Sequence, residues 1–222
     1  MLLQDKLDAL KAQSARSGRV TPDARAVMGR ALADLVASCR AQDALALGAR
    51  APLFTLPGHD GAPVSSCHLL SLGPLVVSFY KGVWCPYCNL ELKALQAALG
   101  GIDAAGGAVV AISPQTPANS RRAARDGGLE FPILADAGNA VAEAFGLRWR
   151  LPDDLLRVYK DLGIDLHLIN GDASGTLPMP ARFVIGRNGT VVYADVNADY
   201  TRRPDPALML PALRQAALAY AA

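Results

Sequence analysis

The chain has 222 residues, of which 51% are hydrophobic and 19% are charged, and this composition excludes an intrinsically disordered protein. Lysines and arginines number 22 against 20 aspartates and glutamates, so the formal net charge of +2 gives no reason to expect a nucleic-acid or lipid partner. No apolar run is long enough to span a membrane, and the first residues lack the basic-then-apolar order of a signal peptide. We therefore expect a cytoplasmic protein, in a compartment that keeps thiols reduced.

Residues 1–46 are expected to form two amphipathic helices ahead of the main domain. The first helix carries its apolar side chains on one face, namely Leu3, Leu7 and Leu10. Thr21 and Pro22 mark the N-cap and the first position of the second helix. Its apolar stripe consists of Met28, Leu32, Leu35, Val36 and Cys39. Because two such helices cannot bury a core alone, they must pack on the main domain or on a second subunit, so a homodimer is one expected arrangement.

From residue 47 onward, strand-like and helix-like segments alternate. Short β-branched and aromatic runs predict strands at 75–80, 108–113, 183–186 and 190–193, with a brief extended segment at 131–134. Helical patterns cover 88–99, 118–126, 139–145, 152–162 and 210–220. Asn188 and Gly189, between the last two strands, favour a tight hairpin turn. This order predicts an α/β fold in which helices flank a mixed central sheet.

Two of the four cysteines, Cys85 and Cys88, form a C-x-x-C pair between a predicted strand and a predicted helix. Pro86 is suited to the first helical position, which makes Cys85 the N-cap and puts Cys88 in the first turn. Free backbone N–H groups and the positive end of the helix favour the thiolate, the reactive form of cysteine. Residues three apart share a helical face, so the two sulfurs can join in a reversible disulfide. The pattern predicts a redox-active pair.

Two other interpretations of the pair are less favoured. A structural zinc site needs four ligands, usually as two pairs, and the remaining candidates are scattered: Cys39, Cys67, His59, His68 and His167. We therefore expect no metal. Inert core cysteines are disfavoured by the electropositive helix start. Elsewhere, the pairs Arg121-Arg122 and Arg202-Arg203 are expected to lie in solvent.

From about residue 47, the sequence resembles the peroxiredoxin family, in its alkyl hydroperoxide reductase/thiol-specific antioxidant (AhpC/TSA) branch. The matching segments are 47–56, 79–80, 86–92, 131–136 and 144–147. Within them Cys88 matches the peroxidatic cysteine of the family, and Glu91 matches the acid that follows it. The resemblance implies a thioredoxin-like fold, no bound cofactor, and reduction of a small hydroperoxide through a cysteine sulfenic acid. An external thiol reductant such as thioredoxin or glutathione would then recycle the enzyme.

The chain departs from the family signature P-x-x-x-T-x-x-C at two positions. Lys81 stands at the proline position and Cys85 at the threonine position. Pro180 stands where the family has its active-site arginine, and Arg182 is expected to supply part of that lost charge. These departures predict slower peroxide reduction than in members with the full signature.

At these positions the sequence is more similar to thioredoxin, whose Trp-Cys-x-x-Cys motif is matched by Trp84 and the cysteine pair. Thioredoxin also has a cis-proline that faces its dithiol, and Pro180 resembles it, so we expect a cis bond between Met179 and Pro180. The Pro-Tyr interior of the pair is that of glutaredoxins and suggests a potential of about −200 to −230 mV.

The sequence therefore predicts a helical extension over 1–46 and a thioredoxin-like, peroxiredoxin-type domain over 47–222, with an insertion at 148–179. The leading hypothesis is a thiol-dependent peroxidase in which the attacking thiol is Cys88 by the peroxiredoxin match or Cys85 by the thioredoxin match, with a slight preference for Cys88. A thiol–disulfide oxidoreductase is the alternative, favoured by the missing threonine and arginine. A binding module on a degenerate fold is a third hypothesis, which the intact cysteine pair disfavours.

Overall fold

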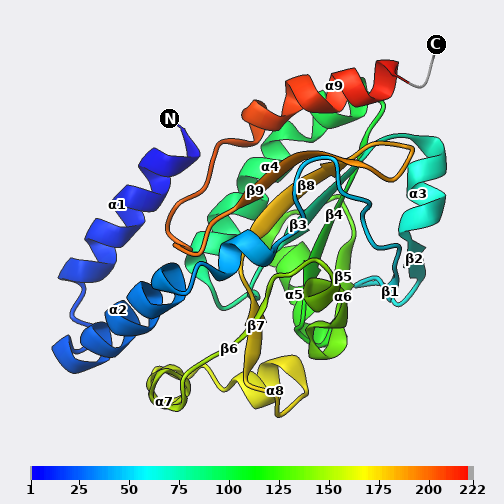
Figure 1. Cartoon of the computed structure of the whole chain (residues 1–222). Helices are drawn as coiled ribbons and strands as arrows, with labels where there is room; N and C mark the ends of the chain where they lie inside the picture. Colours follow the sequence, from blue (N-terminus) through cyan, green and yellow to red (C-terminus); the bar gives the residue numbers. More distant parts are fainter. Residues whose placement is uncertain (1, 220–222) are drawn as a thin grey trace.

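The computed structural model describes residues 2–219 and has a five-stranded mixed sheet at its centre, with helices on both faces (Figure 1). The strand order is β5 (Ile133–Ala135), β4 (Ala108–Ser113), β3 (Leu75–Phe79), β8 (Ala181–Ile185) and β9 (Val191–Val196). The first three strands are parallel, whereas β8 is antiparallel to both β3 and β9. The expected mixed sheet is therefore confirmed.

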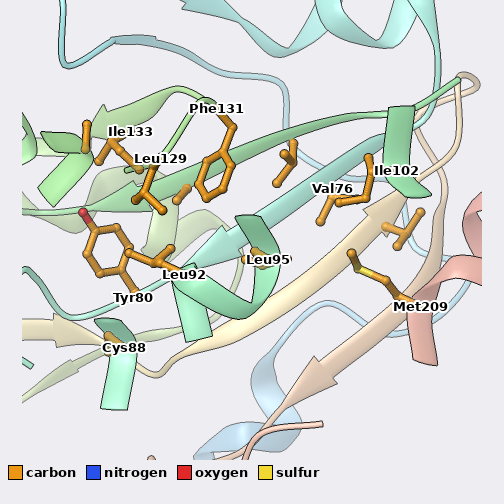
Figure 2. Close-up of a cluster of buried hydrophobic side chains, with 14 of the residues drawn as sticks. Val76, Tyr80, Cys88, Leu92, Leu95, Ile102, Leu129, Phe131, Ile133 and Met209 are labelled. Atoms are coloured by element: carbon orange, nitrogen blue, oxygen red, sulfur yellow. The ribbon is translucent and has the colours of Figure 1, made fainter. Parts of the chain in front are cut away.

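Side chains of β3 alternate between two cores, because successive residues of a strand point to opposite faces of the sheet. Leu75, Val77 and Phe79 lie in the core that α3 (Ser66–Leu72) and α6 (Ala140–Ala144) cover. Val76 lies in the opposite core, beneath α4 (Pro86–Ala104), α5 (Pro117–Gly127) and α9 (Leu210–Leu218). Figure 2 shows this second core, which extends from Cys88 and Tyr80 to Ile102 and Met209.

The hydrophobic pattern of the sequence did not predict several short helices and strands, because three to five residues are too few to show a helical or strand period. They are β1 (Thr55–Pro57), β2 (Pro63–Ser65), β6 (Arg148–Arg150), β7 (Thr176–Pro178), α8 (Leu166–Asn170) and the 3-10 turns Arg40–Asp43, Ala137–Asn139 and Pro206–Met209. Strands β6 and β7 form an antiparallel pair, and the segment that connects them contains α7 (Asp153–Asp161) and α8. That residues 148–179 are an insertion relative to compact relatives stays a prediction.

The two helices expected near the N-terminus are present as α1 (Leu3–Arg16) and α2 (Pro22–Ala37). The Thr21 hydroxyl accepts a hydrogen bond from the Ala24 N–H at 3.2 Å, as an N-cap does. Helix α1 packs against α4, and α2 packs against α7 (Figure 1). The expected apolar stripe extends too far, because α2 ends at Ala37 and Cys39 is exposed with a φ of +54°. Among residues 2–219, no helix is both long and apolar enough to cross a bilayer.

Helix α1 is also hydrogen-bonded to residues 197–205, the loop that follows β9. The Gln4 side chain donates to the Thr201 carbonyl at 3.1 Å and accepts from the Arg203 N–H at 3.0 Å. The Leu3 N–H donates to the Asp205 carboxylate at 3.2 Å. The N-terminal helix therefore fixes the position of this loop.

Two predictions for the C-terminal part of the chain concern the peptide bond before Pro180 and the end of the last helix. The predicted cis bond before Pro180 is wrong, since no peptide bond in the described part of the chain is cis. The Met179 N–H donates to the Leu147 carbonyl at 2.8 Å, so pairing continues from β7 up to Pro180 and the chain enters β8 extended. The expected end of the last helix at Tyr220 lies outside the described residues.

Replacing the fully buried Leu7 by alanine is expected to lower the free energy of unfolding by about 2–5 kcal/mol, because truncation of a buried leucine removes apolar contacts and leaves a cavity. Leu2 is exposed and is the matched control, so Leu2→Ala should change stability by less than about 0.5 kcal/mol. Urea unfolding measures both variants. Equal midpoints would show that α1 does not dock on the domain.

Candidate active site

The cysteine pair begins α4 directly after the central strand β3. Cys85 is the N-cap with extended backbone, and Pro86 occupies the first helical position, as predicted. The preceding turn is closed by the Cys85 N–H, which donates to the Gly82 carbonyl at 3.0 Å. Gly82 has a φ of +145°, and a Cβ there would lie 2.7 Å from the indole nitrogen of Trp84. The turn therefore requires glycine at this position.

Both cysteines are free thiols inside the core, with exposed fractions of 2% for Cys85 and 0% for Cys88. Cys88 lies in the same apolar cluster as Tyr80 and Leu92 (Figure 2). A reactant must therefore enter the protein to reach either sulfur.

The two sulfurs have opposite electrostatic environments. Burial opposes ionisation of Cys85, but the thiol and backbone N–H of Cys88 and the charges of Lys81 and Arg203 outweigh it and lower the pKa of Cys85 to about 5. Burial raises the pKa of Cys88 well above its usual value, and donation to Cys85 and the charge on that sulfur raise it further. The pair therefore favours a thiolate on Cys85 and a proton on Cys88.

Lys81 supplies one of the charges beside this thiolate. Its side chain is only 4% exposed, and its Nζ lies 3.7 Å from the ring centroid of Tyr200 and 5.4 Å from that of Trp84. Both distances are within the range of cation–π contact. Within residues 2–219, Lys81 forms no ion pair with a carboxylate.

Glu91, on the inner face of α4, lies between two buried arginines. Its Oε1 is 2.8 Å from a terminal nitrogen of Arg182, and its Oε2 is 3.4 Å from one of Arg203. Arg203 also donates from Nε and from its second terminal nitrogen to the Tyr200 carbonyl, at 3.2 and 3.0 Å. We call Glu91, Arg182 and Arg203 the arginine–glutamate cluster.

The expectation that Arg202 and Arg203 both lie in solvent is wrong for Arg203. Arg202 is exposed, but Arg203 is buried because Glu91 and a backbone carbonyl satisfy its guanidinium. An adjacent arginine pair carries no sequence signal that distinguishes the buried member. Sequence reasoning therefore missed one of the two cations that act on the cysteines.

Two further predicted site residues, Arg182 and Trp84, make their described contacts with groups other than the cysteines. Arg182 is fully buried, and its guanidinium is held by Glu91 and by the Pro204 carbonyl at 3.4 Å, so its expected role toward peroxide stays a prediction. Trp84 contacts Tyr159 of α7, with ring centroids 5.2 Å apart. Burial raises the pKa of Asp195, opposite Arg182 on β9, to about 6.

A small apolar pocket lies next to Lys81. Pro180 lines it, together with Met28, Leu32, Leu35, Trp149, Leu155, Tyr159, Met179, Ala198 and Tyr200. The cavity volume is about 20 Å³, which is room for a molecule of the size of water. Within the described part of the chain, no three histidine, cysteine, aspartate or glutamate side chains are grouped as a metal site.

The sequence profile of the AhpC/TSA family matches residues 47–194. A chloroplastic peroxiredoxin Q from Sedum lineare is 30% identical over 144 residues, which are 65% of this chain and 65% of that protein. One from Oryza sativa subsp. japonica is 30% identical over 146 residues, which are 66% of this chain and 57% of that protein. The chain thus spans less than two thirds of the length of these curated relatives.

Among solved structures, peroxidoxin BcpB from Mycobacterium tuberculosis superposes with a TM-score of 0.60 at 22% identity, covering 76% of this chain and 96% of that one. This likeness shows the fold and confirms the thioredoxin-like fold that the sequence predicts.

The reduced protein is expected to gain stability as the pH rises from about 5 toward 9, because Cys85 is a thiolate when folded and a thiol when unfolded over that range. Since the unfolded chain then binds one proton more, the slope is at most about 1.4 kcal/mol per pH unit. Urea unfolding of the reduced wild type and of Cys85→Ser as a function of pH measures this slope. The raised pKa of Asp195 makes stability fall with rising pH in both proteins, so the difference between them isolates the contribution of Cys85. A constant difference between the two proteins from pH 5 to 8 would contradict a lowered pKa at Cys85.

Arg203→Met is expected to lower the free energy of unfolding by about 3–5 kcal/mol, because it leaves Glu91 without one of its two buried partners. The pKa of Cys85 should rise in the same variant, since a nearby positive charge is lost. Arg202→Met is the matched control and should change neither quantity. Thermal unfolding and thiolate absorbance near 240 nm provide the two measurements, and identical behaviour of the two variants would refute the role of the buried cluster.

Proposed function

The chain belongs to the AhpC/TSA family, and on this premise we propose that it is a thiol-dependent peroxidase that reduces small hydroperoxides with Cys85 and Cys88. The observation that carries the proposal is the unequal cysteine pair at the start of α4. One sulfur has a pKa of about 5 beside two buried cations, and its partner keeps a proton. A nucleophilic thiolate and a neighbouring thiol are the two groups that peroxide reduction through a disulfide requires.

The proposed reaction has two steps. The Cys85 thiolate attacks the terminal oxygen of the hydroperoxide, so that an S–O bond forms as the O–O bond breaks. The other oxygen leaves as an alcohol after taking one proton from solvent or from a neighbouring acid. The Cys88 thiol then attacks the sulfenic sulfur; an S–S bond forms, the S–O bond breaks, and the oxygen leaves with the Cys88 proton as water. Two electrons from the dithiol have reduced the peroxide.

This proposal reverses the slight preference for Cys88 as the attacking thiol. Cys88 matches the peroxidatic cysteine of the family by position, but burial and the neighbouring Cys85 hold its proton in place. A protonated thiol is a poor nucleophile toward peroxide but can resolve a sulfenic acid on its neighbour. We assign Cys85 to the attack and Cys88 to resolution.

The reductant in the proposal is an external thiol of the thioredoxin or glutathione type, which a reducing compartment such as the cytoplasm supplies. It attacks the disulfide, takes over the S–S bond and returns both sulfurs to the thiol state. No prosthetic group takes part in this cycle.

A thiol–disulfide oxidoreductase is the second candidate, because a low pKa on the first cysteine and a high one on the second also suit disulfide exchange. The burial of both sulfurs favours the peroxidase. A peroxide is only a few atoms in size, so its attack at a sulfur that is 2% exposed needs little movement of the chain. A protein disulfide can reach the sulfur only if the surrounding chain moves, and a protein reductant requires the same movement in the recycling step.

Stopped-flow oxidation of the reduced protein tests the assignment. We expect one equivalent of peroxide to remove two thiols from the wild type. Cys85→Ser should lose the fast reaction, and Cys88→Ser should consume one equivalent and stop at a sulfenic acid that dimedone traps. Cys39→Ser and Cys67→Ser, at exposed cysteines, serve as matched controls and should react like the wild type.

Three outcomes would change the proposal. Fast oxidation of Cys85→Ser with none in Cys88→Ser would exchange the two roles. A wild-type rate no greater than that of a free thiolate would remove the peroxidase function. If the same sample also reduced insulin disulfides, the disulfide oxidoreductase would take its place.

A further inference from the structure

Among residues 2–219, Lys81 differs from the buried arginines Arg182 and Arg203 in having no carboxylate partner. Arg182 and Arg203 are both paired with Glu91. Lys81 instead rests on the faces of Tyr200 and Trp84, and within residues 2–219 no carboxylate pairs with it. Aromatic faces hold the ammonium in place without neutralising its charge, so that charge stays available to a neighbour.

The surroundings of Lys81 place this charge where the proposed reaction occurs. Lys81 lies in the turn between β3 and Cys85, and its ammonium packs on the ring of Trp84, the residue that directly precedes Cys85. Its charge correspondingly favours the thiolate of Cys85. An ammonium group in this position can donate a hydrogen bond to an oxygen atom that reacts at the Cys85 sulfur.

We propose that Lys81 is a catalytic residue that stabilises the Cys85 thiolate before attack and donates a proton to the oxygen that leaves when the O–O bond breaks. The proposal rests on the proposed peroxidase function. In the step, the thiolate and an alkyl hydroperoxide become a sulfenic acid and an alcohol, and Lys81 passes from ammonium to amine. When an external dithiol later reduces the disulfide and Cys85 ionises again, the released proton restores the ammonium.

Tyr200 is the positioning residue of this arrangement. Its ring lies against the Lys81 ammonium, and its carbonyl accepts two hydrogen bonds from Arg203. The Arg203 N–H is in turn held by Gln4 of α1. The cation is therefore fixed through a chain of contacts that includes the N-terminal helix.

The test compares Lys81→Met and Lys81→Arg with Lys93→Met, a change at an exposed lysine of the same helix as the cysteines. Thiolate absorbance should show the pKa of Cys85 raised by about one unit in Lys81→Met, and little changed in the other two. At a pH where the thiolate is fully formed in every protein, Lys81→Met should react with tert-butyl hydroperoxide about 10²-fold more slowly than the wild type. Lys81→Arg should retain most of the rate.

Leaving-group dependence separates proton donation from a merely structural role. Peracetic acid releases a carboxylate that needs no proton, so Lys81→Met should lose at least about tenfold less rate with the peracid than with the alkyl hydroperoxide. Tyr200→Leu should shift toward Lys81→Met, whereas Tyr200→Phe, which keeps the aromatic face, should recover most of the rate that Tyr200→Leu loses. The Tyr200 pair gives the same comparison if Lys81→Met does not fold.

Different results would contradict the roles of Lys81 and the proposed peroxidase function. Equal losses with both oxidants, or a wild-type rate for Lys81→Met with the alkyl hydroperoxide, would refute proton donation by Lys81. An unchanged pKa of Cys85 in Lys81→Met would refute its role toward the thiolate. A wild type no faster than a free thiolate with either oxidant would instead refute the proposed function, and with it the proton donation.

Discussion

The ion pairs of Glu91 with Arg182 and Arg203 are the interactions on which the geometry of this protein depends. They connect three parts of the chain, namely α4, strand β8 and the loop 197–205, inside a region from which water is excluded. Desolvation makes such a cluster costly to form, and loss of one partner leaves a buried charge uncompensated. The cluster therefore disfavours any other relative position of these elements, because separating them would leave a buried charge unpaired.

The same cluster controls the chemistry of the cysteines through its geometry. Arg203 contributes a charge toward both sulfurs and holds the Tyr200 carbonyl, so that the Tyr200 ring supports Lys81. Because Gln4 holds the backbone of Arg203, helix α1 contributes to this arrangement as well as to packing. From the sequence, we predicted only a packing role for residues 1–46. The hydrogen bond from the Arg203 N–H to Gln4 adds a second contact, in which a helix remote in sequence helps to hold the backbone of one buried cation.

Features that neighbouring residues determine could be predicted from the sequence, and features that tertiary contacts determine could not. The helix start at Cys85 and Pro86 follows from local preferences, and so does the alternation of β3 between two cores. The burial of Arg203 depends on Glu91, whose position relative to it only the fold decides. The cis-proline carried over from thioredoxin was wrong because pairing of β6 with β7 extends the chain up to Pro180, a contact that three-residue strands do not reveal in a sequence.

The buried charges also bear on the energy of the oxidised state. In the reduced protein, the Cys85 thiolate and Glu91 face three cations, Lys81, Arg182 and Arg203. Disulfide formation removes the thiolate charge and leaves all three cations behind, so this electrostatic contribution stabilises the oxidised fold less than the reduced fold. Its disulfide is correspondingly more oxidising, by about 30 mV for each 1.4 kcal/mol. Reduction of such a disulfide by an external thiol is correspondingly more favourable at equilibrium, so the arrangement that activates the sulfur also favours its return to the reduced state.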